Sequence, residues 1–388
     1  MRVVVAIDAY KGCLTSAAAG AAARAGVLDA DPRADVRVVP VADGGEGTVD
    51  ALLAGAPGPV HRVVASTVDA LGRPLDAAYA VLDDGATAVV EAASCVGLAQ
   101  VAVDDGLPPR AGSAGLGLLV RHAAAGGARQ VVVALGGTSC TDGGLGLLIA
   151  LGGQVRDDAG AAVPAAGANP LWRFAGLDRL PDPGVGLVVL TDVDSPLHGP
   201  HGAAHVFGPQ KGATPAQVAH LDDRLRAWGA ALAASGRDVA GLPGAGAAGG
   251  LGAALLALGA RREAGAAYVA RAVGLPDALR GADLVLTGEG RVDAQTARGK
   301  TPAAVAAQGR AAGAVVVALA GAVADDAGGD GGPFDAVLPV HPRPLPLAEA
   351  MDPAVAAAGI RRTAAQVTRL VAVARDGDRL LAPRPVAP

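Results

Sequence analysis

Six short polar segments of the chain carry an acid or a lysine, five of them together with glycine, and most of them follow a run of residues that predicts a β-strand. Open parallel α/β sheets bind their ligands where strands end, so charged side chains in these segments are candidates for chemistry. The glycines keep the backbone beside them free of bulk. The segments are residues 7–12 (IDAYKG), 42–48 (ADGGEGT), 136–144 (GGTSCTDGG), 191–196 (TDVDSP), 207–212 (FGPQKG) and 287–293 (TGEGRVD).

These residue types are the ones that phosphoryl transfer requires. Catalysis of that reaction is mostly positioning and charge neutralisation, supplied by backbone N–H groups and lysine for phosphates, carboxylates for Mg²⁺, and an acid that accepts the hydroxyl proton. Asp192 and Asp194 stand two residues apart at a predicted strand end, and would point the same way if the strand continued. Such a pair could hold one metal ion or divide the metal and base roles. The alternative is that both simply stabilise a turn.

Lysine is rare in this chain and always stands beside glycine. Of 32 basic residues, only Lys11, Lys211 and Lys300 are lysines, and the others are arginines. A position that keeps lysine can need a compact ammonium group acting as a point charge on a phosphate. The alternative is compositional drift towards arginine, but the shared glycine neighbours favour function.

Two familiar nucleotide-binding motifs carry little weight here. Residues 244–249 (GAGAAG) match the dinucleotide fingerprint, but the chain has 57 glycines and no strand is predicted before this stretch. We interpret it as a flexible or phosphate-facing loop of unknown role. Residues 294–301 (AQTARGKT) would form a P-loop if position 294 were glycine, but Ala294 stands there and Pro302 follows.

Strand and helix signals alternate at both ends of the chain. At the amino end, a strand at 3–7 and a helix at 15–27 precede a strand at 36–41 and a helix opening near Glu46. At the carboxyl end the same order recurs. The elements expected there are strands at 283–287, 315–319 and 336–338 and helices at 303–312 and 353–372. This alternation predicts a parallel sheet built from both chain ends.

The middle of the chain predicts a second α/β domain. Short strands at 62–65, 77–82 and 88–91 are followed by helices at 116–125 and 215–234. We therefore expect an α/β protein with a Rossmann-like parallel-sheet domain from residues 1–60 and 280–388 and an inserted α/β domain from residues 61–279. The active site is expected in the cleft between the domains.

Composition excludes several other classes of protein. The net charge is −5 and only 2% of the 388 residues are aromatic, so a nucleic-acid partner is not expected. No apolar run is long enough to span a membrane, and the amino end lacks the pattern of a signal peptide. Three widely spaced cysteines suggest no disulfide framework. We expect a cytoplasmic protein, and its oligomeric state is left open.

Three long stretches look like signatures of one family. Residues 40–48 (PVADGGEGT), 206–213 (VFGPQKGA) and 286–293 (LTGEGRVD) resemble the bacterial glycerate kinases of the first type, in the family's order. The segments at 8–12, 136–144 and 192–196 are similar to further loops of that family. The resemblance covers about residues 2 to 375, and it is specific because the motifs are long.

The resemblance implies a two-domain α/β kinase that phosphorylates D-glycerate with ATP and Mg²⁺. The 2-hydroxyl is the expected acceptor, giving 2-phosphoglycerate. Two other functions stay open: a non-catalytic binder of small phosphorylated acids, and a P-loop nucleotide hydrolase. The paired acids at Asp192 and Asp194 favour catalysis, because a pure anion binder gains nothing from carboxylates aimed at its ligand.

The resemblance also implies which residues act. The expected catalytic residues are Asp192, Lys11, Asp43 and Lys211. The expected nucleotide-binding residues are Gly136, Gly137, Asp142, Gly288, Glu289, Asp293 and Lys300. Glycerate is expected to contact Asp8, Glu46 and Arg291, and Mg²⁺ to contact Asp194 and Asp192. The chain departs from the family pattern at Ala9, Cys13, Thr141, Ser195 and His201, which puts fine substrate preference in question more than reaction type.

Overall fold

A computed structural model describes residues 1–82, 85–293, 296, 301–324 and 332–375. The chain forms two compact units. Unit 1 comprises Met1–Ala42, Asp50–Pro57 and Val269–Pro388, and unit 2 comprises Asp43–Val49 and Gly58–Tyr268. The expected two-domain α/β class with a parallel-sheet core is confirmed. The domain limits that we predicted from the sequence stay predictions.

The sheet of unit 1 has five parallel strands in the order β13-β12-β11-β1-β2. Strand β1 lies where the order reverses, with Val5 opposite Leu286 of β11 on one side and Val38 of β2 on the other. Its valine-rich run is almost wholly buried, as expected for a parallel strand covered on both faces. The strands are β1 (Arg2–Ile7), β2 (Asp35–Val38), β11 (Leu284–Val292), β12 (Val315–Val323) and β13 (Ala336–Pro339).

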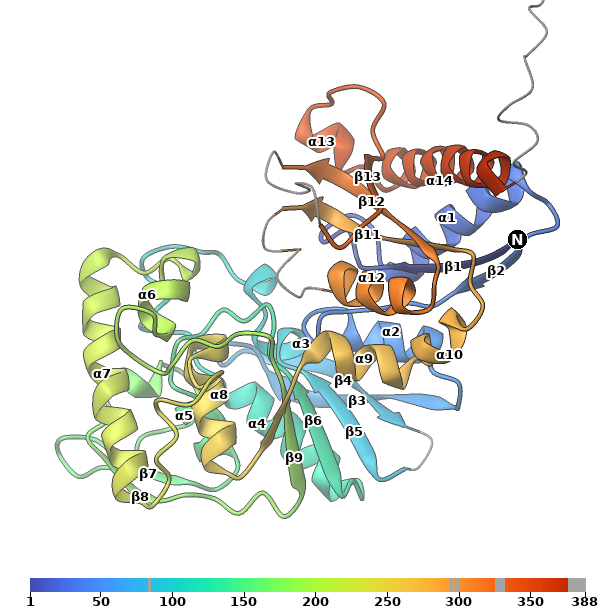
Figure 1. Ribbon diagram of the computed structural model, residues 1–388. Helices are drawn as coiled ribbons and strands as arrows, with labels where there is room; N and C mark the ends of the chain where they lie inside the picture. The colour runs from blue at the N-terminus through green and yellow to red at the C-terminus, as the bar shows by residue number, and fades with distance from the viewer. Residues whose placement is uncertain (83–84, 294–295, 297–300, 325–331, 376–388) are drawn as a thin grey trace, which may run out of the picture. The chain divides into compact units, whose positions relative to one another are not determined.

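Helices cover both faces of this sheet (Figure 1). Helices α1 (Ser16–Ala30) and α14 (Pro353–Arg375) pack together on one face, and α12 (Thr301–Ala311) covers the other. The two long helices meet closely at Gly26, where a Cβ atom would lie 2.0 Å from the Arg361 carbonyl oxygen. The shorter helices are α2 (Thr48–Gly55), α9 (Gly265–Ala272), α10 (Leu275–Leu279) and α13 (Leu347–Ala350).

The sheet of unit 2 has six strands in the order β10-β9-β6-β5-β4-β3. Strands β10, β9, β6 and β5 are parallel, whereas β4 pairs antiparallel with both β5 and β3. The carboxyl ends of the four parallel strands therefore meet at one edge. The strands are β3 (Val60–Val68), β4 (Pro74–Leu82), β5 (Thr87–Glu91), β6 (Gln130–Ala134), β9 (Gly186–Leu190) and β10 (Arg261–Glu263).

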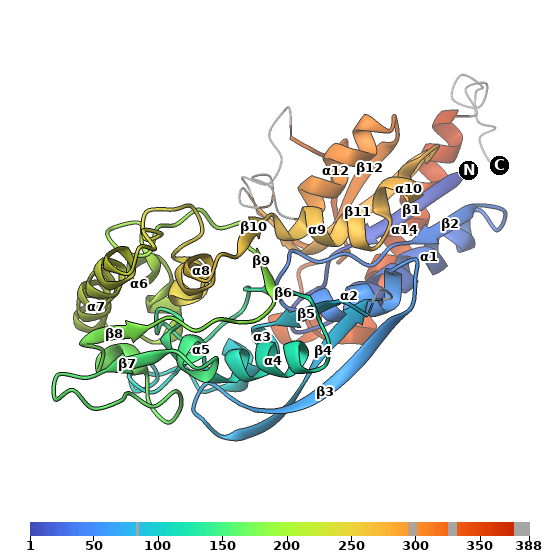
Figure 2. The ribbon, with the colours of Figure 1, turned by 90° about the horizontal axis from the view of Figure 1, so that it is seen from below.

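A large apolar core binds the helices of unit 2 to this sheet, and Trp228 is its largest fully buried side chain. A hairpin of β7 (Gln154–Arg156) and β8 (Gly176–Arg179) lies beside α5 and α7 (Figure 2). The helices are α3 (Ala93–Val96), α4 (Ala114–Ala125), α5 (Leu145–Ala150), α6 (Ala203–Phe207), α7 (Pro215–Ala234) and α8 (Ala247–Ala257), with 3-10 turns at Leu98–Gln100, Pro170–Trp172 and Pro209–Lys211.

Local sequence signals place several elements well. Helix α7 begins and ends where we predicted. Thr214 and Gln217 form a capping box that fixes its start. The strand expected at 36–41 ends early, at Val38, and Pro40 lacks the N–H group that a longer strand would need. Within the described residues, none of the helices has the length and apolar character needed to cross a membrane.

Candidate active site

The first group of predicted residues lies in unit 1, at the adjacent carboxyl ends of β1 and β11. Asp8 is 5% exposed and accepts a hydrogen bond from the Ala9 backbone N–H at 2.7 Å, while its own N–H donates to the Gly288 carbonyl at 2.8 Å. Gly288 has φ +147°, and a Cβ there would lie 1.8 Å from the Leu319 carbonyl oxygen, so only glycine fits. The sheet order reverses here, which is where open α/β sheets bind ligands.

Acidic residues continue along the same edge. The Thr296 hydroxyl donates to the Glu289 carboxylate at 2.7 Å, and the Thr296 backbone N–H donates to the Asp293 carboxylate at 3.2 Å. Arg291 is exposed, and its Nε atom lies 3.8 Å from the Asp293 carboxylate in an ion pair. Thr296 thus ties together Glu289 and Asp293, both of which we predicted to bind the nucleotide.

Lys11 stands on a short loop fixed by the residue before it. The Tyr10 hydroxyl donates to the Leu319 carbonyl at 2.9 Å, and Tyr10 is 4% exposed. Burial, and then the charge of Glu289, raise the pKa of Tyr10 well above its usual range. Lys11 itself is exposed and Gly12 has φ +75°. A neutral, anchored tyrosine therefore positions a lysine at the surface of this edge.

A second group lies in unit 2, where two glycine-rich loops touch through their backbones. A Cβ on Gly136 would lie 2.6 Å from the Gly45 Cα, and a Cβ on Gly44 would lie 2.5 Å from the Gly265 Cα. The Gly45 backbone N–H donates to the Asp43 carboxylate at 2.9 Å. Because the glycines allow this approach, the half-buried Asp43 lies close to Gly136 and Gly265, which are distant in sequence.

Asp192 follows β9 and belongs to this second group. It keeps an exposed face, and its carboxylate accepts a hydrogen bond from the Gly265 backbone N–H at 3.1 Å. Partial burial raises the pKa of Asp192 above its usual value, and the nearby charge of Asp43 raises it further. Hydrogen bonds from Gly265 and Ala266 and the charge of Arg262 oppose this rise. Asp192 and Asp43 are thus two carboxylates near enough to interact.

Asp194 faces different surroundings. Strand β9 ends at Leu190, so the condition under which Asp192 and Asp194 would point the same way is not met. The Arg262 guanidinium lies 2.6 Å from the Asp194 carboxylate and also donates to the Val193 carbonyl at 3.2 Å. The Asp194 side chain is 78% exposed. Arg262 thus holds the turn that presents both acids.

The loop at 136–144 is held from within by a buried carboxylate. Asp142 is fully buried and accepts four hydrogen bonds, from the Ser113 N–H and hydroxyl at 2.7 Å each, the Gly144 N–H at 2.9 Å and the Gly146 N–H at 3.1 Å. Burial raises the pKa of Asp142, and these hydrogen bonds lower it. These contacts favour a role in fixing the loop, and a direct contact of Asp142 with nucleotide stays a prediction.

Lys211 holds the same loop from the other side. It is 4% exposed, and its Nζ atom donates to the Cys140 carbonyl at 2.6 Å and to the Thr138 hydroxyl at 3.2 Å. Burial lowers the pKa of Lys211. Gly212 follows with φ +87°, and a Cβ there would lie 2.1 Å from the Asp104 carbonyl oxygen. The glycine beside this lysine therefore permits close packing against Asp104.

The stretch at 244–249, whose role the sequence left open, also supports this loop. A Cβ on Gly249 would lie 2.2 Å from the Cys140 carbonyl oxygen, and the Gly143 N–H donates to the Gly249 carbonyl at 3.0 Å. The chain turns here through left-handed conformations that include Ala248, with φ 53°. The turn at 248–250 therefore packs against the loop at 136–144.

Comparison with known proteins identifies the family to which these loops belong. The model of the glycerate kinase family matches residues 3–372. The chain belongs to the glycerate kinase family. It is 38% identical to a glycerate kinase of Bacillus subtilis (strain 168), over 97% of this chain and 99% of that protein. It is also 38% identical to a glycerate 2-kinase of Escherichia coli (strain K12), over 84% and 87% of the two chains.

A solved structure agrees with this assignment. A glycerate kinase 2 from Salmonella typhimurium LT2 superposes with a TM-score of 0.81 at 35% identity, covering 97% of this chain and 99% of that one. Membership of the glycerate kinase family makes the chain a phosphotransferase, the reaction class that its residue types had indicated.

The sequence reasoning missed several residues of this glycerate kinase. Glu91 ends β5, is 8% exposed, and accepts a hydrogen bond from the Val49 backbone N–H at 2.5 Å. It obeys the rule that selected the other acids, since it stands at a predicted strand end. Arg262 and Gly265 gave no such signal, because their contacts with the 191–196 turn join segments about seventy residues apart.

The donor set of the glycerate kinase suits a single Mg²⁺ ion. Within the described residues, no three His, Cys, Asp or Glu side chains gather into a metal cluster. Mg²⁺ keeps several waters and takes one or two carboxylates, so it needs no such cluster. Asp43 raises the pKa of Asp192, and a cation beside both would offset this repulsion.

Of the other predicted residues, Glu46 is exposed, Gly137 has φ +77°, and Lys300 lies outside the described residues.

Proposed function

We propose that this glycerate kinase transfers the γ-phosphoryl group of ATP to the 2-hydroxyl of D-glycerate, giving 2-phosphoglycerate and ADP, with Mg²⁺ as cofactor. The observation that carries the proposal is that Asp43, in the glycine-rich loop at 42–48, and Asp192, in the turn after β9, lie near enough to interact. Family membership supports the substrate and the donor. The expected location is the cytoplasm.

Asp192 is the proposed acceptor of the proton of the glycerate hydroxyl. Its pKa is raised by partial burial and by Asp43, so it is a stronger base than an ordinary aspartate. The Gly265 N–H holds the carboxylate in one orientation. A group with this basicity and this support is suited to take a proton as the oxygen attacks phosphorus.

Asp43 is the proposed Mg²⁺ ligand, with Asp192 beside it. When bound, the ion would neutralise charge on the phosphate oxygens. Asp194, which we also predicted as a ligand, is paired with Arg262, and this ion pair favours a role in holding the turn. Metal titration of the variants distinguishes the two assignments.

The unit 1 group is proposed to bind the phosphates of ATP. Lys11 is an exposed ammonium on an anchored loop, and such a point charge suits a phosphate. Asp8 and Gly288 lie at the reversal of strand order, where nucleotides bind in open α/β sheets. We propose that both groups of residues serve the same reaction.

A coupled assay of ADP release tests the proposal. We expect ADP to form only when glycerate and Mg²⁺ are both present, with D-glycerate preferred to L-glycerate. Phosphorus NMR of the product would distinguish 2-phosphoglycerate from 3-phosphoglycerate. ADP release that ignores glycerate would point to a nucleotide hydrolase, and ATP binding without turnover would point to a binding protein.

A further inference from the structure

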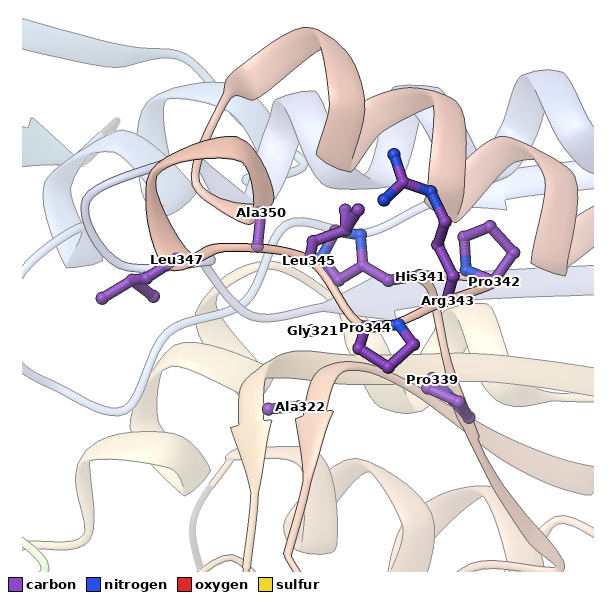
Figure 3. Close-up of a pocket in the computed structure, with 10 residues that line it drawn as sticks. All are labelled: Gly321, Ala322, Pro339, His341, Pro342, Arg343, Pro344, Leu345, Leu347 and Ala350. Carbon is purple, nitrogen blue, oxygen red and sulfur yellow. The ribbon is translucent and has the colours of Figure 1, made fainter.

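Unit 1 contains a pocket that the proposed mechanism does not yet use. It has a volume of about 500 Å³ and lies between the ends of β12 and β13 and the segment of residues 341–350 (Figure 3). Gly321 and Ala322 of β12 form its floor together with Pro339 of β13. Most of the remaining wall is proline and leucine.

The chemistry of the wall suits a flat, largely apolar ring. Pro342 and Pro344 are rigid, and Leu345 and Leu347 add aliphatic surface. Leu347 is 76% exposed, so its apolar surface is accessible to a ligand. Glycerate has three carbons and is polar throughout, so it would gain nothing from this wall. The volume is in the range of ordinary small-molecule sites.

The pocket lies on β12 and β13 of the same sheet as the proposed phosphate site, which is at the ends of β1 and β11. Gly321 touches β11, because a Cβ on Gly321 would lie 2.5 Å from the Gly290 carbonyl oxygen. Gly290 in turn lies against the Lys11 loop, since a Cβ on Gly290 would be 3.9 Å from the Lys11 backbone nitrogen. The backbones of β12, β11 and the Lys11 loop therefore lie side by side between the pocket and Lys11.

A second contact joins the pocket wall formed by α13 to the Lys11 loop. Met351 follows α13, whose Leu347 and Ala350 line the pocket, and a Cβ on Gly12 would lie 3.2 Å from the Met351 Cε atom. Neighbouring strands are about 4.8 Å apart, so the pocket lies roughly two strands, or about 10 Å, from the β1–β11 junction. A ribose and its first phosphate can span that interval.

We infer that this pocket binds the adenosine part of the nucleotide, with the phosphates running over Gly290 towards Lys11. The inference rests on the proposed use of ATP and deepens it, because it gives the base a site of its own. Arg343 lines the pocket and is paired with Glu349 at 2.9 Å, and most of the other lining residues are apolar.

The test fills the pocket in the full-length enzyme. Ala322 is exposed on β12, so Ala322→Trp should fold and place a large ring in the pocket. The matched control is Ala311→Trp, at an exposed position that ends α12 and does not line the pocket. We expect Ala322→Trp to weaken ADP binding at least ten-fold by calorimetry and to raise the KM for ATP similarly. The KM for glycerate should stay within two-fold, and the control should match wild type.

A milder variant and a labelling experiment guard against misfolding. Leu347→Ser removes an exposed wall residue and should weaken ADP binding by several-fold without lowering the melting temperature. In the wild-type chain, 8-azido-ATP should label a peptide from residues 339–350. Labelling that maps elsewhere would overturn the inference.

The outcomes separate this inference from the proposed function. If the wild type phosphorylates glycerate but both pocket variants bind ADP normally, the inference is wrong and the function stands. If Ala322→Trp raises only the KM for glycerate, the pocket serves the acceptor and the inference is also wrong. If the wild type shows no glycerate-dependent ADP release, the proposed function fails, and ADP binding still tests the pocket.

Discussion

Lys11 and Lys211 present the same local sequence, a lysine beside glycine, in opposite surroundings. Unit 1 leaves Lys11 at the surface, on a loop anchored by Tyr10, whereas unit 2 buries Lys211 against the Cys140 carbonyl. An exposed ammonium can meet a phosphate. The buried Lys211 donates to the backbone of the loop at 136–144 and so helps to fix that loop.

The carboxylates of unit 2 divide in the same way. Asp142 is fully buried and accepts four hydrogen bonds from its own loop and from Ser113, while Asp192 keeps an exposed face and lies near Asp43. Burial therefore separates residues that hold the site from residues able to react. Five predictions test whether this division extends to kinetics and to stability.

The largest effect should come from the exposed acid. Asp192→Asn keeps the shape of the side chain but removes the proton acceptor, so kcat should fall by about 10²- to 10⁴-fold at every Mg²⁺ concentration. Asp194→Asn is the matched variant, two residues away in the same turn, and because Asp194 is paired with Arg262 we expect a smaller loss of kcat that added Mg²⁺ does not restore. The measurement is kcat against Mg²⁺ for both proteins, with thermal melting as the check on folding. A near-normal kcat in both would remove this turn from the active site.

The buried lysine should affect the loop more than the fold. Lys211→Met removes the donor to Cys140 and Thr138, and we expect kcat to fall by roughly ten-fold or more. Each lost hydrogen bond costs about 1–3 kcal/mol, but relief from burying an ammonium group offsets that cost. The melting temperature should therefore change little. A large loss of stability with normal kcat in the surviving protein would show that Lys211 supports only the fold.

The same pair of proteins gives a pH signature for this buried lysine. Burial lowers the pKa of Lys211 in the folded chain below its ordinary value of 10.5, so the unfolded chain binds that proton more tightly. Between the two pKa values, stability then rises with pH. The melting temperature of wild type relative to Lys211→Met should increase as the pH rises towards 10.5. If the difference in melting temperature between the two proteins does not change with pH, burial does not lower the pKa of Lys211.

A smaller effect, of another kind, should follow from the exposed lysine. Lys11→Met should leave the melting temperature unchanged and raise the KM for ATP by roughly ten-fold, because one charge on the phosphates is lost. Lys11→Arg keeps the charge but changes its geometry, so its KM for ATP should lie between those of wild type and Lys11→Met. Initial rates at varied ATP and fixed glycerate would show the effect. If the KM for glycerate rises instead, unit 1 contributes to binding the acceptor.

The smallest effect should appear in a pH profile. Partial burial is the main cause of the raised pKa of Asp192, and the charge of Asp43 is a second cause. The acid limb of kcat should lie above pH 3.8, the ordinary value for aspartate, and should move to lower pH in Asp43→Asn. The residual activity of the variant, measured at saturating Mg²⁺, is sufficient for this comparison. An acid limb that does not move would mean that the two carboxylates are independent.

Much of this arrangement could be predicted from local sequence. The valine-rich run at 3–7 and the capped helix at 215–234 depend on neighbours along the chain, so their periodicity and end signals were enough. The strand ends before Asp8 and Asp192 could be located for the same reason, whereas β11 continues past the predicted end at 287 to Val292 and includes Glu289. The glycine-rich signatures at 40–48, 206–213 and 286–293 indicated the family.

Only the tertiary structure decided what each charged residue touches. Arg262 pairs with Asp194, Gly265 supports Asp192, and Asp142 binds Ser113, and each contact joins segments that are far apart in the sequence. Burial depends on every element packed around a residue, so the sequence around Lys11 and Lys211 could not distinguish a surface charge from a buried one. The pocket beside β12 escaped notice for the same reason, since its walls come from three separate elements.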